Sequence, residues 1–176
     1  MTTPTRTTGT ERELLETILD QARADLVDTV RGLSETDARR RLVPSLTTPI
    51  ALIKHATFAE RMWFQRTLGQ LADPDCDGPL WAHGGFVVGE EETVAEVIAE
   101  FERASARARS IAAGIPLDET REHPRMGVVS LRWIFMFMAA EFARHAGHGD
   151  ILREQIEADG GSSAALSLRG RPDPQV

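Results

Sequence analysis

One stripe of side chains with helical spacing constrains this chain more than any other feature. Positions 131, 134, 138, 141, 145, 148 and 152 alternate by three and four residues, the spacing of side chains that face the interior of a helix bundle. Their occupants are Leu131, Ile134, Met138, Glu141, His145, His148 and Leu152. The stripe is therefore apolar at both ends and carries one carboxylate and two imidazoles in its middle. Because an unpaired carboxylate inside a bundle is costly, this pattern predicts a partner or a ligand for Glu141.

Three further stretches carry the signals of long helices. Thr10 with Glu13, and Thr93 with Glu96, have the spacing of a capping box, in which each side chain satisfies a free backbone amide. Pro49, just after a threonine, is typical of the first turn of a helix. We expect long helices at residues 10–33, 48–69, 93–114 and 130–158, with a short helix at 34–42. With no credible pair of strands, they predict an all-α protein, an antiparallel four-helix bundle.

The length of 176 residues corresponds to a single domain. We expect a flexible N-terminus at residues 1–9, the bundle at 10–159 and a C-terminal tail at 160–176. The tail contains Gly, Ser and Pro and has little apolar periodicity, which is typical of a mobile or partner-docking segment. Residues 73–89 hold two prolines and four glycines and predict a loop.

Composition excludes several classes of function. A net charge of −7 and a pI near 5.3 give no support to binding of nucleic acid or of an anionic membrane, both of which need a basic surface. We find no secretory signal and no run of about 18 apolar residues that could span a bilayer, so we expect a cytoplasmic protein. The only cysteine, Cys76, excludes an internal disulfide and a cysteine-based zinc cluster.

A metal site is the more specific of two interpretations of the polar residues in the stripe. Glu141 and His145 lie four residues apart, so their side chains project from the same face of a helix and can share one cation. His55 is the candidate third ligand, roughly 70° from the centre of the apolar side of its helix, whose opposite side carries Lys54, Arg61 and Gln65. Two histidines and one carboxylate with an open fourth position suit catalytic zinc or another borderline divalent ion. The alternative is a buried hydrogen-bonded cluster in which Glu141 pairs with histidine or with Arg144.

Two other metal sites are excluded by spacing. Asp73, Asp75 and Asp77, followed by Gly78, imitate the start of an EF-hand, but position 12 would be Gly84 where calcium needs a bidentate glutamate. A di-iron bundle needs Glu-x-x-His pairs, and no histidine of this chain has glutamate three residues before it.

The remaining reactive side chains have ordinary interpretations. Cys76 lies among the carboxylates of the acidic loop, which should raise the pKa of its thiol and make it a poor nucleophile. His83 and His123 lie in predicted loops, where we expect them at the surface.

The sequence also resembles a known family. The run from Leu131 to Glu157, with Glu-Phe-Ala-Arg-His-Ala-Gly-His at residues 141–148, resembles the C-terminal helix of DinB-like proteins. More narrowly, it is similar to an actinobacterial branch related to mycothiol-dependent enzymes. Residues 33–40 and 53–64 are similar to the end of that family's first helix and to its second helix. The resemblance covers about residues 11–160.

The resemblance implies a four-helix bundle, often a homodimer, with a divalent metal such as zinc or nickel at one end of the core. Carried over by position, the metal ligands are His55, Glu141 and His145, and a carboxylate in the second place is similar to the mycothiol-dependent maleylpyruvate isomerase type. His148 stands where many relatives have glutamine, and we treat it as a neighbour of the site. Phe137 departs from the histidine that the closest relatives often have.

These observations predict a metal-dependent thiol S-transferase or isomerase-like enzyme. Its partners would be a low-molecular-weight thiol such as mycothiol and an electrophile, with His148 as the proton acceptor or as a residue that orients a metal ligand. The alternatives are a non-catalytic metal- or ligand-binding stress protein and a metal-dependent hydrolase with bound water as nucleophile. A closed site with four ligands, including His148, would favour a structural metal, because catalytic zinc keeps one position open.

Overall fold

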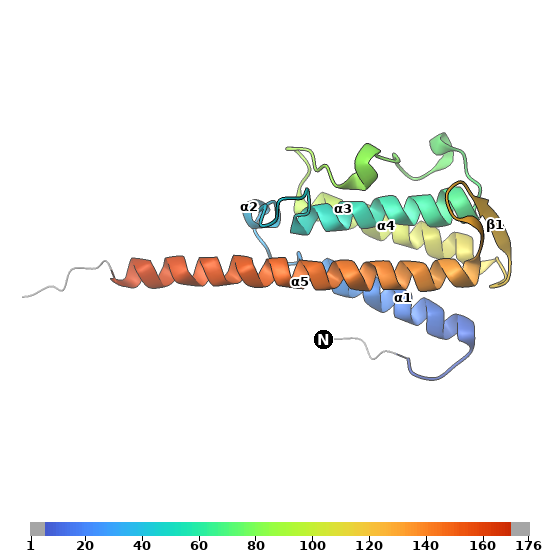
Figure 1. The fold of residues 1–176 in the computed structure, drawn as a ribbon, viewed down its shortest axis with the longest axis horizontal. Coiled ribbons are helices and arrows are strands. Elements are labelled where there is room, and N and C mark those ends of the chain that lie inside the picture. Colours follow the sequence, from blue (N-terminus) through green and yellow to red (C-terminus); the bar gives the residue numbers. More distant parts are fainter. Residues whose placement is uncertain (1–5, 170–176) are drawn as a thin grey trace, which may run out of the picture.

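The protein is described by a computed structural model that covers residues 6–169, with side chains described for residues 6–81 and 83–159. The described part is mainly helical, which confirms the predicted class (Figure 1). In chain order the elements are α1 (Glu11–Asp28), α2 (Glu35–Ala38), α3 (Pro49–Glu60), the π-helix η1 (Arg61–Leu68), the 3-10 turns η2 (Asp73–Asp75) and η3 (Ala82–Gly85), α4 (Val94–Ala113), β1 (Thr120–His123), β2 (Gly127–Ser130) and α5 (Leu131–Arg169).

The helices begin where local signals place them. Thr10 and Thr93 both form complete capping boxes with the glutamate three residues later, at the starts of α1 and α4. The Thr48 side chain accepts a hydrogen bond from the amide of Ala51, with Pro49 in the first turn of α3. Helix ends differ more from expectation. The first helix ends at Asp28 and the short one at Ala38, several residues before the predicted ends.

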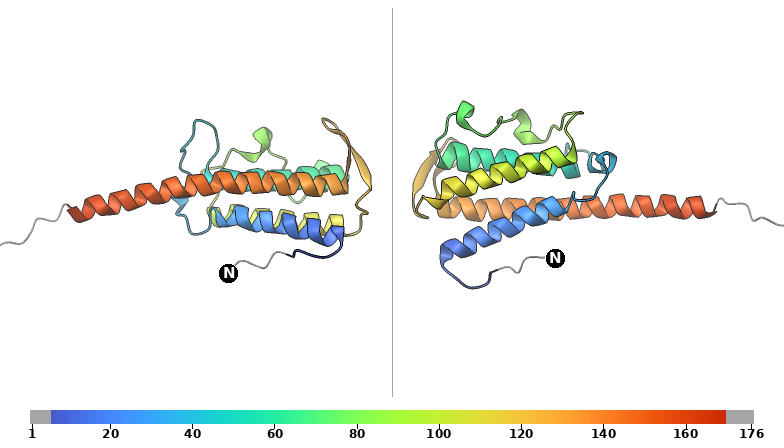
Figure 2. Two further views of the ribbon diagram at one scale, coloured as in Figure 1. Left: turned by 60° about the horizontal axis from the view of Figure 1, so that its bottom comes forward. Right: turned by 180° about the vertical axis from the view of Figure 1, so that it is seen from behind.

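Contacts between helices create the core in which the polar stripe of α5 is set. α1 packs along α5, while α3 packs against both α4 and α5 (Figures 1 and 2). The last part of α5 extends past the other helices (Figure 1). All four long helices contribute fully buried side chains, among them Leu19, Leu26, Ile50, Leu52, Phe64, Phe101, Leu131, Ile134 and Phe142. Burial of these apolar groups is the main stabilising contribution to the arrangement.

The structure corrects two predictions along the chain. Residues expected to form a loop instead form an antiparallel hairpin, in which Thr120 pairs with Ser130 and His123 with Gly127. α5 also continues through residues 160–169, where we expected the tail to begin, and residues 1–5 and 170–176 of the predicted termini lie outside the described residues. Within the described part of the chain, no helix combines the length and hydropathy that a membrane crossing needs.

Residues 73–89 lie over the side of α3 and η1 that carries polar side chains. The side chains of Lys54, Arg61 and Gln65 are buried there, although such groups ordinarily face water. Lys54 pairs with Glu92, while Arg61 pairs with Asp77 and Glu100. The charged side of α3 and η1 is therefore an anchoring surface for the loop, and the loop reaches His55.

Candidate metal centre

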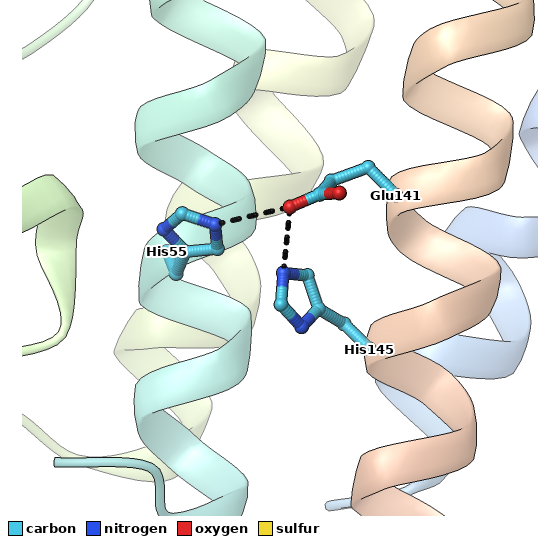
Figure 3. Close-up of side chains that lie close together, drawn as sticks. All are labelled: His55, Glu141 and His145. Carbon is cyan, nitrogen blue, oxygen red and sulfur yellow. Dashed lines mark hydrogen bonds and ion pairs between the residues drawn. The ribbon is translucent and has the colours of Figure 1, made fainter. Parts of the chain in front are cut away.

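The three side chains predicted as ligands converge between α3 and α5 (Figure 3). His55 projects from α3, while Glu141 and His145 project from successive turns of α5. One nitrogen or oxygen atom from each lies within 4.8 Å of the other two. Glu141 Oε1 is 3.1 Å from His145 Nε2 and 3.8 Å from His55 Nε2. Two metal–ligand bonds of about 2.0–2.2 Å can span both separations from Glu141 Oε1, so one small divalent ion fits between this oxygen and each of the two histidine nitrogens.

The ring of His55 is held in one orientation by the loop. Its Nδ1 lies 2.6 Å from the carbonyl oxygen of Gly84. A carbonyl can only accept, so Nδ1 carries the proton and donates it to Gly84. The ring of Phe86 stacks on the imidazole at 4.3 Å with an interplanar angle of 20°. In the neutral imidazole the Nε2 atom then has a free lone pair directed toward Glu141, as a metal ligand requires.

The contact between His55 and Glu141 is unfavourable without a cation. With its proton on Nδ1, neutral His55 cannot donate from Nε2, so a nitrogen lone pair faces a carboxylate oxygen at 3.8 Å. Either a metal ion between the two atoms or a second proton on His55 removes this repulsion. The first case is the metal interpretation, and the second is the buried hydrogen-bonded cluster.

His145 has the protonation state of a ligand. Its burial, reinforced by the nearby His55, lowers the pKa of His145 below its ordinary value despite the opposing effect of Glu141. The imidazole is therefore neutral near pH 7 and can offer a lone pair. Its Nε2 lies 3.1 Å from Glu141 Oε1 and donates to that carboxylate when no metal is bound, while its Nδ1 is buried without a hydrogen-bond partner among the described residues. Binding of an ion at Nε2 therefore requires the proton to move to Nδ1.

The two oxygens of Glu141 have separate partners. Oε1 faces both histidines, while Oε2 lies 3.0 Å from the guanidinium of Arg144, whose side chain is largely exposed. The pairing with Arg144 was part of the alternative interpretation, and the structure contains it. It occupies the outer oxygen and leaves the inner one directed at the two imidazoles.

His148 lies beside the three residues without joining them. Its ring centroid is 5.7 Å from that of His145, and its side chain is exposed. Among the described residues, the set of atoms close enough to share an ion contains His55, Glu141 and His145 only. A site with three protein ligands leaves a coordination position free, as catalytic zinc sites do.

The other side chains that the sequence analysis discussed do not belong to this group of candidate ligands. His83 is exposed, as predicted. The prediction for His123 was wrong: its ring is half-buried and stacks on Trp63 at 4.5 Å, because the hairpin carries it onto η1. Burial, more than the neighbouring acidic groups, raises the pKa of the Cys76 thiol. Phe137 stacks on Trp133 at 4.9 Å and contributes an aromatic ring next to the centre.

Sequence reasoning missed the contribution of Gly84 and Phe86. The Gly84–Gly85 pair signals a turn with positive φ, and both glycines have φ values in that region, at 64° and 79°. That signal is local, however, and does not reveal that the turn aims a carbonyl at a histidine nearly thirty residues earlier.

Comparison with known proteins identifies a family. No curated protein matches the chain. The family model described as mycothiol S-transferase matches residues 14–158, which is most of the chain and includes all three residues of the centre. The chain belongs to the mycothiol S-transferase family.

Proposed function

We propose that this protein is a metal-dependent enzyme that transfers mycothiol to an electrophile. Membership of the mycothiol S-transferase family supports the thiol and the transfer reaction. The observation that carries the metal dependence is the single carboxylate oxygen of Glu141 that faces the Nε2 atoms of both His55 and His145. Zinc or nickel is the ion that this set of two nitrogens and one oxygen favours.

The residues of the centre have distinct roles in this proposal. A divalent ion bound there would favour the thiolate form of the substrate, which is the form that attacks electrophiles. His55 and His145 hold the ion as neutral ligands, and Glu141 supplies one negative charge. His148, exposed beside His145, accepts the thiol proton and passes it to solvent. The new sulfur–carbon bond forms as the leaving group departs with its bonding electron pair.

We also propose that the four long helices form an antiparallel DinB-like bundle, and that the protein is a cytoplasmic homodimer. Support for the dimer comes from the groove between α1 and α5, where the apolar side chains of Ile18 and Met136 are both 50% exposed. Sedimentation analysis would test it: the proposal predicts a dimer for the wild type, and a monomer at all concentrations would contradict it.

Conjugation of mycothiol to 1-chloro-2,4-dinitrobenzene tests the proposed reaction. We expect catalysed conjugation by the metal-loaded protein, its loss after treatment with a chelator, and its return when zinc or nickel is added back. His145→Ala should remove the activity together with the metal. Conjugation that proceeds unchanged in the presence of chelator, with no metal bound, would contradict the proposal.

The role of His148 needs a separate variant. His148→Gln should retain the metal but lower the catalysed rate about 100-fold or more, since general bases typically contribute at least that factor. Added imidazole should restore part of the rate, because an exposed position is open to a small base. A wild-type rate in His148→Gln would exclude His148 as the proton acceptor.

A further inference from the structure

The strip of α5 that carries Glu141 continues toward the hairpin as aromatic side chains. Phe137 and Trp133 precede Glu141 by one and two turns at four-residue spacing, so they lie along the same side of the helix. Trp63 of η1 faces them, with its ring centroid 4.9 Å from that of Phe137 and 5.5 Å from that of Trp133. The seam between α3–η1 and α5 is thus polar at the metal centre and aromatic next to it.

The rings in this seam form two stacked pairs, which are tilted by 55° to each other. Trp133 and Phe137 stack at 4.9 Å with an interplanar angle of 11°. His123 of the hairpin stacks on Trp63 at 4.5 Å and 12°. We call these four side chains the aromatic cluster. Burial and a neighbouring Arg125 lower the pKa of His123, so the cluster is uncharged near neutral pH.

The aromatic cluster is not sealed within the core. Trp133 and Phe137 are both half-buried, so part of each ring remains accessible. Trp133 also forms one wall of a pocket of about 340 Å³ at the hairpin, which closes the end of the α3–α5 pair where α5 begins (Figure 1). The other lining residues are uncharged: Thr120, Met126, Val128, Val129 and Ser130. A volume of this size accommodates a small apolar molecule.

We infer that the electrophile is an uncharged, planar aromatic molecule whose ring lies against the aromatic cluster while its reacting carbon reaches the metal centre. This inference rests on the proposed function. One turn of α5, about 6 Å along the helix axis, separates Phe137 from Glu141. A single ring with a short reactive arm matches that separation. Flat aromatic faces favour an aromatic occupant over an aliphatic one, because offset stacking adds stabilisation beyond the buried area.

Two enones that differ only in their apolar group test this preference. Phenyl vinyl ketone and ethyl vinyl ketone both react with a thiol by addition. The sulfur–carbon bond forms at the β-carbon, the carbon–carbon π bond breaks, and the α-carbon takes a proton in place of the one that the thiol lost. The measured quantity is kcat/KM with mycothiol for each ketone, divided by the uncatalysed rate constant. We expect this ratio to favour the phenyl ketone in the metal-loaded wild type.

Two variants test whether the aromatic cluster causes the preference for the phenyl ketone. Phe137→Leu should reduce the selectivity for the phenyl ketone by about 2- to 12-fold, the range of a lost aromatic pair. Phe101→Leu makes the same change in the core at a fully buried ring outside the cluster, and should leave the selectivity unchanged. Equal selectivity in wild type and Phe137→Leu, or an equal loss in both variants, would overturn the inference.

A binding measurement separates this inference from the proposed function. Propiophenone is the unreactive analogue of phenyl vinyl ketone, and pentan-3-one is the aliphatic match. Propiophenone should shift the NMR signals of the Trp133 and Trp63 indoles, with weaker binding in Phe137→Leu, whereas pentan-3-one should shift them little. If neither enone is conjugated but propiophenone still binds at the aromatic cluster, the proposed transfer reaction is wrong and the inferred aromatic binding site is supported. Indole signals that stay unmoved, or that move equally with both ketones, would contradict the site.

Discussion

The tautomer of His55 decides whether its Nε2 atom is available to a metal ion. The Gly84 carbonyl fixes that tautomer, and it reaches His55 because the backbone turns through left-handed conformations at Gly84 and Gly85. A Cβ atom on Gly85 would lie 2.9 Å from the carbonyl oxygen of Lys54, closer than such atoms pack. The position of the loop therefore depends on the absence of a side chain at residue 85.

We predict that Gly85→Ala weakens zinc binding by about 10- to 100-fold, the usual cost of losing a group that orients a metal ligand. Calorimetric titration of the metal-free protein with zinc measures this effect. Gly127→Ala is the matched control, because Gly127 also has a positive φ, of 70°, but has open space around it in the hairpin turn. Wild-type affinity in Gly85→Ala, or the same loss in both variants, would exclude the orienting role.

Arg61 connects η1 to the loop that contains Gly84. Its guanidinium donates to Asp77 at 2.8 Å, to the carbonyl oxygen of Pro79 at 3.1 Å and to Glu100 of α4 at 2.7 Å. A Cβ on Gly78 would collide with the Arg61 guanidinium, so the backbone passes directly over the side chain. These three acceptors lie on two separate segments, the loop and α4. Only the planar guanidinium of an arginine, with several N–H donors, can reach all of them at once.

Arg61→Lys should loosen this loop, because one ammonium group on a shorter stem cannot reach all three acceptors. We expect faster amide hydrogen exchange across residues 73–89 than in the wild type, with unchanged protection in α1. Arg66→Lys is the control, since Arg66 is exposed on the same element and pairs with Asp73 outside the buried contacts. Equal exchange in wild type and Arg61→Lys would show that other contacts hold the loop.

The helices could be predicted because their signals are local. Thr10 with Glu13 and Thr93 with Glu96 identify helix starts within four residues of sequence, and the spacing of Glu141 and His145 on α5 places both on one face. Such signals require no knowledge of distant segments. They predicted the pair of candidate ligands on α5 and the helix that presents the third candidate.

The hairpin could not be predicted, because distant contacts stabilise it. Each strand has four residues, too few for a clear alternating pattern. It is held on η1 by Arg121, which donates to the Leu68 carbonyl, and by the stacking of His123 on Trp63. The same limit applies to the contact of Gly84 with His55, which joins segments that no local pattern links. The glycines at residues 160–161 predicted an end to α5 that the helix does not have.

A buried ion pair joins three of the long helices of the molecule. Arg23 of α1 makes two hydrogen bonds to Glu60 of α3, at 2.7 and 2.9 Å, and Ser105 of α4 donates to the same carboxylate at 3.2 Å. The side chain of Glu60 is fully buried. Removing one member of such a pair leaves an uncompensated charge in the interior. These charges were not recognised from the sequence, because nothing local shows that either side chain is enclosed.

Arg23→Met should lower the free energy of unfolding by about 3–5 kcal/mol, which is the usual cost of stranding a buried charge. Urea denaturation followed by circular dichroism measures it. The double variant Arg23→Met with Glu60→Leu should recover much of this loss, since both charges are then absent. Arg31→Met is the surface control, and breaking its exposed pair with Asp28 should cost less than about 1 kcal/mol. Similar losses in Arg23→Met and Arg31→Met would contradict the role of the buried pair.

The number of zinc ions bound by the metal-free protein in equilibrium dialysis tests the metal centre most directly. The account predicts a single tightly bound ion per wild-type chain and its loss in His55→Ala, Glu141→Ala and His145→Ala. His148→Ala should still bind one ion, because His148 lies outside the group of His55, Glu141 and His145. Wild-type stoichiometry and affinity in all three ligand variants would contradict the metal centre, and with it the metal dependence of the proposed transfer.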